Sequence, residues 1–390
     1  MCALTLRSRE LGAYATFLGV SGGFNEVLAG PNPCDHAQVN SGTRARAYER
    51  VTRLSGAKLD LPELFAESAR LLATALPHDT ACWHTMDPAT LIETGVHFEN
   101  MPHADAHVAK IAYLSDDYNN FVQLAQGRRH SGVLSEETGG QLDRSQRYRE
   151  LLRPQNFRGE LRTAFVVDGA CWGCFAFFRE APADFSTDER DFAHQLSSLL
   201  GRAFRAAGVH GRATGAGAAL WPGLLLLDGR RRVESVNAPA QRWLEELGFH
   251  GAPEHDPLPF ALLAVAERVR GPAQEATTRV RGSSGTWIQL HASSASGSGE
   301  QGRVAIILQA ATPPAIAPLI SAAYGFTSRE RELIELVLQG SGTAEIAARL
   351  FISPHTVQGH LKSIFAKAGV RSRRELVTRV FVQHDASARL

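Results

Sequence analysis

Closely spaced helix starts and stops between residues 325 and 382 restrict the fold more than any other feature of this chain. Thr327 and Glu330 have the spacing of a capping box, which predicts the start of a first helix, and Gly340 suits its end. A second helix is expected over residues 343–350, where apolar residues recur at helical spacing. So many short helices in so few residues predict a small all-α domain near the carboxyl end.

A third predicted helix carries a polar face that no hydrophobic core requires. Ser353 is a favourable N-cap, Pro354 suits the first helical position, and Gly369 ends the helix. Its apolar face comprises Val357, Leu361, Ile364, Phe365 and Ala368, and its opposite face comprises His355, Gln358, Gly359 and Lys362. Ser372 and Glu375 begin a fourth helix. The polar face of the third helix is therefore free to enter a groove of a partner.

Four segments of this stretch are similar to the LuxR-type DNA-binding domain. They are FTSRERE from Phe326, AEIAARL from Ala344, ISPHTVQGHLK from Ile352 and GVRSRRE from Gly369. The resemblance covers residues 325–382 and implies a helix-turn-helix protein that works as a dimeric transcription regulator on double-stranded DNA. It also makes RNA polymerase a candidate partner.

The charge of this region points the same way. Residues 349–379 hold seven lysines or arginines and one acid, Glu375, whereas the whole chain has a net charge of only +1. Such a basic cluster predicts a polyanionic partner. The alternative is a helical bundle that binds another protein while its charges are simply solvated. The capping residues and the apolar core positions all fit the same pattern of four short helices, and this consistency favours the DNA-binding interpretation.

The resemblance also assigns roles to single residues. A helix fits the major groove of DNA, where its side chains meet base edges, while cations fix its register on phosphates. By resemblance, the residues facing the bases are Gln358, Gly359 and Lys362. The candidates for phosphate contacts are Thr356, Lys367, Arg371 and Arg373. Gln358 replaces a lysine that is common in the family, and glutamine prefers adenine where lysine prefers guanine.

Length and composition set the frame for the rest of the chain. At roughly 150 residues per domain, 390 residues predict two or three domains. Apolar runs such as residues 224–227 are far shorter than the roughly 18 residues of a membrane span, so no membrane partner is expected. Five cysteines predict no disulfide framework and indicate the cytoplasm. Residues 1–45 have the composition of a poorly ordered leader, and export is not expected.

Residues 46–207 have the pattern of a mixed α/β domain. The predicted elements are a helix over 61–76 and strands over 80–85, 92–98, 161–167 and 170–179. Asp168-Gly169 predicts a tight hairpin between the last two strands, and Ser186 with Glu189 predicts the capping box of a closing helix. This order of elements resembles a GAF domain, a sensory fold that usually encloses a small-molecule pocket.

A second α/β domain is expected after a Gly- and Ala-rich linker at residues 208–217. Strands are predicted over 223–227, 232–236, 276–280, 286–292 and 303–309, with a helix that Asn237 caps. This pattern resembles a PAS domain over residues 218–311. A connector at 312–324, stiffened by Pro313, Pro314 and Pro318, ends in a short helix from Leu319 to Tyr324, and residues 383–390 form a tail. The expected fold class is therefore α+β multidomain, with two sensory domains before the all-α domain.

The cysteines allow a chemical alternative. Cys171 and Cys174 have the C-x-x-C spacing of redox sites, but three residues along a predicted strand should place their sulfurs on opposite faces. Cys82 and His84 share a strand face and could meet Cys174 across the sheet. A thiol-based redox sensor, or a GAF enzyme similar to a methionine sulfoxide reductase, therefore stays open as the alternative to a plain sensory domain.

Other catalytic sites are not expected. His97, His103 and His107 follow no metal-ligand spacing, so neither a metal nor another cofactor is inferred. The sequence has no G-x-x-x-x-G-K-[ST] loop for a nucleotide and no receiver-like opening that would indicate control by phosphorylation. The chain is therefore expected not to be an enzyme.

Aromatic residues of the GAF-like region suggest an effector site. An apolar cavity for an aromatic or lipid-like effector could be lined by Trp83, Tyr113, Tyr118, Phe121, Tyr148 and Trp172. Packing in the core is the alternative use of these rings. Taken together, the sequence predicts a homodimeric regulator whose sensory domains bind a small molecule or mediate dimerisation, and the alternative is a dimer that binds DNA without any effector.

Overall fold

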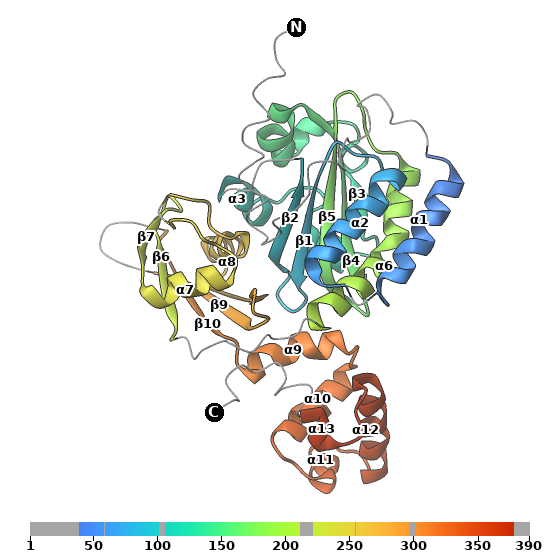
Figure 1. Cartoon of the computed structure of the whole chain (residues 1–390), viewed down its shortest axis with the longest axis vertical. Coiled ribbons are helices and arrows are strands. Elements are labelled where there is room, and N and C mark those ends of the chain that lie inside the picture. Colours follow the sequence, from blue (N-terminus) through green and yellow to red (C-terminus); the bar gives the residue numbers. More distant parts are fainter. Residues whose placement is uncertain are drawn as a thin grey trace.

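The computed structural model describes residues 39–57, 59–100, 106–210, 221–253, 255–295 and 302–377, which form three folded parts (Figure 1). The first sheet unit (residues 39–210) and the second sheet unit (residues 221–310) each contain a five-stranded antiparallel sheet. The third part is the carboxyl-terminal bundle (residues 326–377). These parts confirm the expected mixture of two α/β units and a helical carboxyl-terminal domain.

The first sheet lies between two layers of helices and has the strand order β2-β1-β5-β4-β3. Its strands are β1 (Thr80–Asp87), β2 (Ile92–Glu99), β3 (Ser131–Val133), β4 (Phe157–Val167) and β5 (Ala170–Glu180). One face is covered by α1 (Ser41–Leu54), α2 (Leu61–Ala75) and α6 (Thr187–His210) (Figure 1). The chain between β2 and β4 carries α3 (Ala106–Leu114), α4 (Phe121–Gln126), α5 (Leu134–Glu137) and the single turns Leu142–Arg144, Tyr148–Leu152 and Arg153–Gln155. The apolar residues of α4, α5 and these turns pack on the opposite face of the sheet, whereas Ala109 of α3 belongs to the core of the second sheet unit.

Local signals in the first sheet unit are confirmed. Asp168 and Gly169 both have positive φ, 52° and 75°, as a tight hairpin between β4 and β5 requires. The N–H of Ser186 donates to Glu189 Oε2 over 2.9 Å, and the N–H of Glu189 donates to Ser186 Oγ over 3.3 Å. This capping box starts α6 where the sequence predicts it.

Helix α1 begins inside the segment that the sequence pattern assigns to a leader. The Asn40 side chain caps it by accepting a hydrogen bond from the N–H of Thr43 over 2.8 Å. Ala47, Val51 and Leu54 are buried against the other helices of this face. Three small or medium apolar residues one turn apart give a weak sequence signal, because only tertiary contact makes them a core face. The rest of the predicted leader, residues 1–38, lies outside the described residues.

The Cys171–Cys174 segment has a geometry that the sequence pattern did not predict. Val166 pairs with Cys171 while Ala164 pairs with Cys174, so two steps along β4 oppose three steps along β5. This β-bulge shifts the alternation of side chains. Both cysteines consequently belong to one buried cluster on the α4 and α5 face. The prediction that their side chains point to opposite faces is wrong.

The second sheet has the order β7-β6-β10-β9-β8, which repeats the chain order of the first sheet. Its elements are β6 (Gly223–Leu227), β7 (Val233–Val236), α7 (Ala238–Glu246), α8 (Phe260–Arg270), β8 (Glu275–Arg281), β9 (Trp287–Ser294) and β10 (Val304–Ala310). Asn237 caps α7, as predicted, by accepting from the N–H of Ala240 over 2.9 Å. Helix α8 packs against its own sheet and also against α3 and β2 of the first sheet unit. The two sheet units therefore share a buried contact.

The predicted connector is one continuous helix, α9 (Pro313–Ala323), rather than a proline-stiffened segment with a helix starting at Leu319. Pro313 and Pro314 occupy the first turn, where backbone N–H groups have no helical acceptor, so these prolines cost no hydrogen bond. Ile316 and Leu319 are buried in the same apolar cluster as α6. Their burial offsets the hydrogen bond that Pro318 removes inside the helix.

Helices that could cross a lipid bilayer were sought among the residues that the structure describes. None of these helices is both long enough and apolar enough to do so.

Candidate nucleic-acid interface

The carboxyl-terminal bundle consists of α10 (Ser328–Leu338), α11 (Thr343–Arg349), α12 (Pro354–Ala368) and α13 (Arg373–Val377). The Thr327 side chain accepts from the N–H of Glu330 over 3.2 Å, and the Glu330 carboxylate accepts from the N–H of Thr327 over 2.7 Å, so the predicted capping box is confirmed. Gly340 and Gly369 follow α10 and α12 with φ of 80° and 63°. These left-handed residues stop the two helices as the sequence predicts.

Helix α12 turns its apolar face into the bundle. Val357, Leu361, Ile364 and Ala368 are buried, and α12 packs against α10 and α11. The opposite side holds the three residues that the resemblance assigns to base contacts, and Gln358, Gly359 and Lys362 are all exposed. The packing of one face thus decides which face stays open.

Gly359 stands in open space. A Cβ atom added at this position would meet no atom within 4 Å. Glycine inside a helix is less favourable than alanine by about 1 kcal/mol. No contact within the described part of this chain requires glycine at this position. Close approach of another molecule to the helix backbone would require it.

The four predicted phosphate-contacting residues differ in their surroundings. Thr356 lies in the first turn of α12, where its N–H donates to the Oγ of Ser353 over 3.0 Å. Arg371 is exposed, and its backbone N–H donates to Glu375 Oε2 over 2.9 Å. Arg373 donates from Nη2 to the carbonyl of Ser341 over 2.8 Å. The Oγ1 of Thr356 also lies 2.9 Å from Ser353 Oγ, so Arg371 has the freest of these side chains for an external partner.

Lys367 connects two helices of the bundle. Its Nζ lies 2.6 Å from Glu330 Oε2 and 3.0 Å from the carbonyl oxygen of Gly325. Burial by itself raises the pKa of Glu330, but hydrogen bonds from Lys367, Ser363 and the N–H of Thr327 lower it to about 2. The ammonium group uses two of its three N–H donors inside the bundle, so one remains for an external anion.

Phe351 lies in the turn between α11 and α12. It has a φ of 54° and is 94% exposed. An almost fully exposed aromatic ring thus lies just before the first turn of α12.

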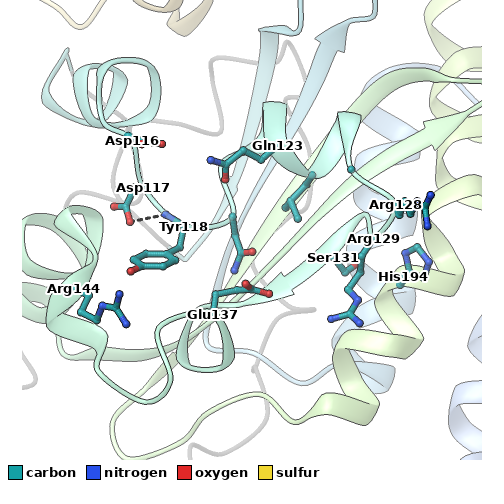
Figure 2. Close-up of a pocket in the computed structure, with 13 residues that line it drawn as sticks. Asp116, Asp117, Tyr118, Gln123, Arg128, Arg129, Ser131, Glu137, Arg144 and His194 are labelled. Carbon is teal, nitrogen blue, oxygen red and sulfur yellow. Dashed lines mark hydrogen bonds between the residues drawn. The ribbon is translucent and has the colours of Figure 1, made fainter.

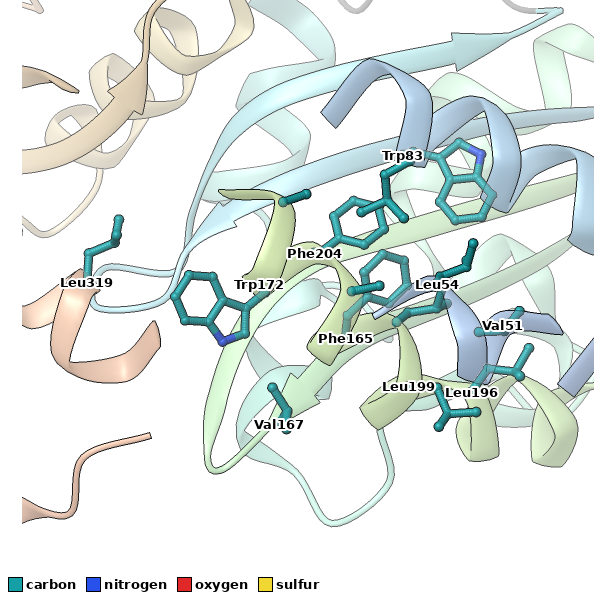
Figure 3. Packing of buried hydrophobic residues seen from close by; sticks show 14 of the residues in the cluster. Val51, Leu54, Trp83, Phe165, Val167, Trp172, Leu196, Leu199, Phe204 and Leu319 are labelled. Atoms are coloured by element: carbon teal, nitrogen blue, oxygen red, sulfur yellow. The ribbon is translucent and has the colours of Figure 1, made fainter. Parts of the chain in front are cut away.

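The six aromatic residues predicted to line one effector cavity are divided by the first sheet. Trp83 and Trp172 belong to the core on the α1, α2 and α6 side, where Trp83 has no exposed surface (Figure 3). Tyr118, Phe121 and Tyr148 pack in the cluster on the other face. Tyr113 packs against the core of the second sheet unit. The structure thus brings three of these rings together and places the other three elsewhere.

A polar cleft of about 880 Å³ lies beside α4, β3, α5 and α6, and the sequence analysis did not predict it (Figure 2). Its charged lining residues include Asp116, Arg128, Arg129, Glu137 and Arg144. Of the predicted aromatic residues, Tyr118 is at its wall, with the Arg144 guanidinium 5.8 Å from the ring centroid. Its volume falls in the range of small-molecule sites, but its lining suits a polar ligand rather than the expected lipid-like one.

Of the cysteines of the first sheet unit, Cys171 and Cys174 are buried and Cys82 is partly buried. Cys82, Cys171 and Cys174 are unpaired, and His84 faces Cys174 across the β1–β5 ladder, as the strand pattern suggests. Burial raises the pKa of Cys82 and of Cys171 to about 12. A thiol with such a pKa stays protonated at neutral pH and is a poor nucleophile. Among the described residues, no group of three His, Cys, Asp or Glu side chains is arranged to hold a metal ion.

Comparison with known proteins agrees with the geometry of the bundle. The family described as "Bacterial regulatory proteins, luxR family" matches residues 325–380. The HTH-type transcriptional regulator Mb0914c of Mycobacterium bovis is 49% identical over 51 residues, which is 13% of this chain and 6% of that protein. The chain thus spans only a small share of the length of these mycobacterial relatives.

A shorter relative is covered over most of its length. The spore germination protein GerE of Bacillus subtilis is 47% identical over 51 residues, which is 13% of this chain and 69% of GerE. Among solved structures, the GAF domain of a phosphoenolpyruvate-protein phosphotransferase from Coxiella burnetii aligns with 42% of this chain and 92% of that chain, at 14% identity and a TM-score of 0.29. Through its carboxyl-terminal bundle, the chain belongs to the LuxR family of bacterial regulatory proteins.

Proposed function

We propose that this protein is a sequence-specific transcription regulator that lays α12 in the major groove of double-stranded DNA. The observation that carries the proposal is the exposed row of Gln358, Gly359 and Lys362 on a helix whose other face is locked in the bundle. Gln358 and Lys362 offer hydrogen-bond donors to base edges, and Gly359 lets the helix backbone approach closely. Family membership of the bundle supports this assignment.

Phosphate contacts are proposed for the residues around this row. Arg371 and Thr356 contact the DNA backbone with their side chains, and the third N–H of Lys367 and the Nη1 group of Arg373 add to these contacts. The amino-terminal end of α12 contributes a favourable partial positive charge. These contacts fix the register of the helix without reading sequence.

The two sheet units are proposed to act as GAF-like and PAS-like input domains of a homodimer in the cytoplasm. A small molecule bound there would shift the population between DNA-competent and incompetent dimers. The repeated strand order of the two sheets and the polar cleft support an input role. A dimer that binds DNA constitutively is the alternative, and its operator affinity would not respond to any ligand.

The first experiment is selection of bound sequences from random duplexes with the purified full chain. We expect a two-fold motif whose half-site spacing reports the dimer geometry. On the selected duplex, Lys362→Ala should weaken binding about 5- to 150-fold, because it removes a base contact of roughly 1–3 kcal/mol. Lys110→Ala is the matched control, since Lys110 is an exposed lysine on α3. No enrichment of any motif, or equal affinity of both variants, would refute the groove assignment.

A further inference from the structure

Three ionisable side chains are buried together on the first sheet, on the face opposite α1, α2 and α6. They come from three strands: His84 from β1, Glu93 from β2 and Arg162 from β4. Their exposed fractions are 5%, 4% and 7%. Their charges influence one another, because both Glu93 and Arg162 affect the pKa of His84. This face therefore carries a polar layer where a hydrophobic core would be the usual solution.

Each of these three side chains has one buried polar atom without a hydrogen-bond partner. Nδ1 of His84, Oε2 of Glu93 and Nε of Arg162 are buried without a partner among the described residues. The nearest approach within the set, 3.9 Å between His84 Nδ1 and Glu93 Oε2, is too long for a hydrogen bond. Buried ionised groups are normally paired, so this layer is incomplete as it stands.

A neighbouring arginine makes the contrast clear. Arg147 is just as buried, yet it donates to both Glu160 oxygens over 2.8 and 2.7 Å and to the carbonyl of Tyr118 over 2.9 Å. For Arg162 the described contact is with an aromatic ring, since its Cζ lies 3.8 Å from the centroid of Phe121. The fold can therefore satisfy a buried guanidinium in this region, and it leaves the Nε of Arg162 without a partner.

We infer that this polar layer is the binding site for a small zwitterion of the amino-acid class, with its carboxylate on Arg162 and its ammonium group on Glu93. The inference rests on the proposed input role of the first sheet unit and names its ligand class. A guanidinium pairs with a carboxylate through two parallel hydrogen bonds, and an ammonium group completes a buried carboxylate. Burial lowers the pKa of His84, so its neutral ring offers one further hydrogen bond to the ligand.

The polar cleft lies next to this site. Asn119 lines the cleft and packs on Gly132, since a Cβ at Gly132 would be 2.2 Å from Asn119 Oδ1. Gly132 in turn pairs with Arg162 across the β3–β4 ladder. The Nδ2 of Asn119 is itself buried and without a partner. The side chain between the cleft and the strand position paired with Arg162 is therefore polar, with an amide nitrogen that has no partner.

The site also touches the second sheet unit. The His84 ring lies 5.8 Å from the ring of Phe260 on α8 and 5.9 Å from the ring of Phe121. Arg268 of α8 donates to the carbonyl of Thr90, in the turn between β1 and β2, over 3.2 Å. A ligand between Arg162 and Glu93 would therefore alter the surface on which α8 rests, which is how occupancy would reach the rest of the chain.

The test is thermal unfolding of the full chain with each of the twenty common L-amino acids at one fixed concentration. At least one is expected to raise the melting temperature, whereas its N-acetyl derivative and its decarboxylated amine are not. A panel without any stabilising amino acid would overturn the inference. Equal stabilisation by the acetylated form or by the amine would overturn it as well. The acetylated form lacks the ammonium charge and the amine lacks the carboxylate charge, and the proposed site requires both.

Two variants locate the effect. Arg162→Met should abolish the ligand response and also raise the melting temperature of the ligand-free protein, since it removes a buried unpaired charge. Glu93→Gln should abolish the rise in melting temperature on adding the ligand while keeping the shape of the side chain. This variant decides the test if Arg162→Met does not fold. Arg158→Met, at an exposed position of β4, is the matched control and should keep the response. A retained response in Glu93→Gln or in folded Arg162→Met would refute the site. Binding of the selected duplex by the wild-type chain tests the proposed function separately.

Discussion

The carboxylate of Asp87 and the guanidinium of Arg279 form a two-point ion pair at the contact between the two sheet units. Arg279 Nε lies 2.8 Å from Asp87 Oδ2, and Arg279 Nη2 lies 3.1 Å from Asp87 Oδ1. The side chain of Arg279 is 7% exposed and that of Asp87 is 0% exposed. The Nη1 of Arg279 also donates to the carbonyl of Ala315 in α9 over 2.8 Å. One arginine thus links the first sheet unit, the second sheet unit and the helix that leads to the carboxyl-terminal bundle.

Removing the charge of Asp87 should loosen this junction. Asp87→Asn keeps the shape of the side chain but leaves Arg279 as an uncompensated buried charge, which should destabilise the protein by roughly 3–5 kcal/mol. Urea unfolding of the full chain measures the change. Glu234→Gln is the matched control, because its pair with Arg303 is partly exposed and should contribute less than about 1 kcal/mol. Equal losses in the two variants would mean that the buried pair has no special role.

The pH dependence of the bundle should follow Glu330. Its folded-state pKa of about 2 lies below its ordinary value of 4.5, so it contributes stability that is fully present above about pH 4.5. That contribution is lost progressively as the pH falls toward 2. Glu330→Gln should lower stability at neutral pH and remove this part of the acid sensitivity.

Urea unfolding between pH 2 and 6 compares Glu330→Gln with wild type. Glu332→Gln serves as control, because Glu332 is a more exposed carboxylate on the same helix, paired with Arg329 over 2.6 Å. The control should retain the acid-sensitive part of the wild-type curve. If Glu330→Gln loses stability between pH 4.5 and 2 as steeply as wild type does, the network around Glu330 is not the cause of the acid sensitivity.

Much of this architecture is local and could therefore be predicted from the sequence. The capping box at Thr327, the N-cap at Asn237 and the hairpin at Asp168 each depend on residues within a few positions of one another. The same holds for the exposed face of α12, because helical periodicity alone separates Lys362 from Leu361.

The remaining features depend on contacts between distant parts of the chain. Asp87 and Arg279 are 192 residues apart, and no sequence pattern joins them. Helix α8 is apolar on nearly every side because it lies between two units, so it lacks the amphipathic period that would predict it. The bulge beside Cys171 arises from the register between β4 and β5, which the β5 sequence does not encode by itself.

Substitutions of Gly359 should affect the stability of the bundle and its DNA affinity differently. Gly359→Ala should stabilise the bundle by up to about 1 kcal/mol, because the added methyl group meets open space and alanine favours the helix. Gly359→Leu should fold equally well but weaken DNA binding strongly, because a bulky side chain would hold the helix away from the base edges.

Thermal unfolding and fluorescence anisotropy with the selected duplex measure the two effects of Gly359. Gln241→Leu places the same side chain on an exposed position of α7 and should leave DNA affinity unchanged. Full DNA affinity of Gly359→Leu would show that this part of α12 does not face the groove.

The salt dependence of DNA binding should identify Arg371 as a phosphate contact. Each neutralised phosphate contributes close to one unit to the slope of log affinity against log salt concentration, because binding releases condensed counterions. Arg371→Ala should therefore lower the magnitude of this slope by about 1 while weakening binding to all duplexes alike. Arg242→Ala removes an exposed arginine from α7 and should leave the slope unchanged. Anisotropy titrations from low to moderate salt with the selected and a scrambled duplex provide the measurement. An unchanged slope, or a loss confined to the selected sequence, would exclude a phosphate contact at Arg371.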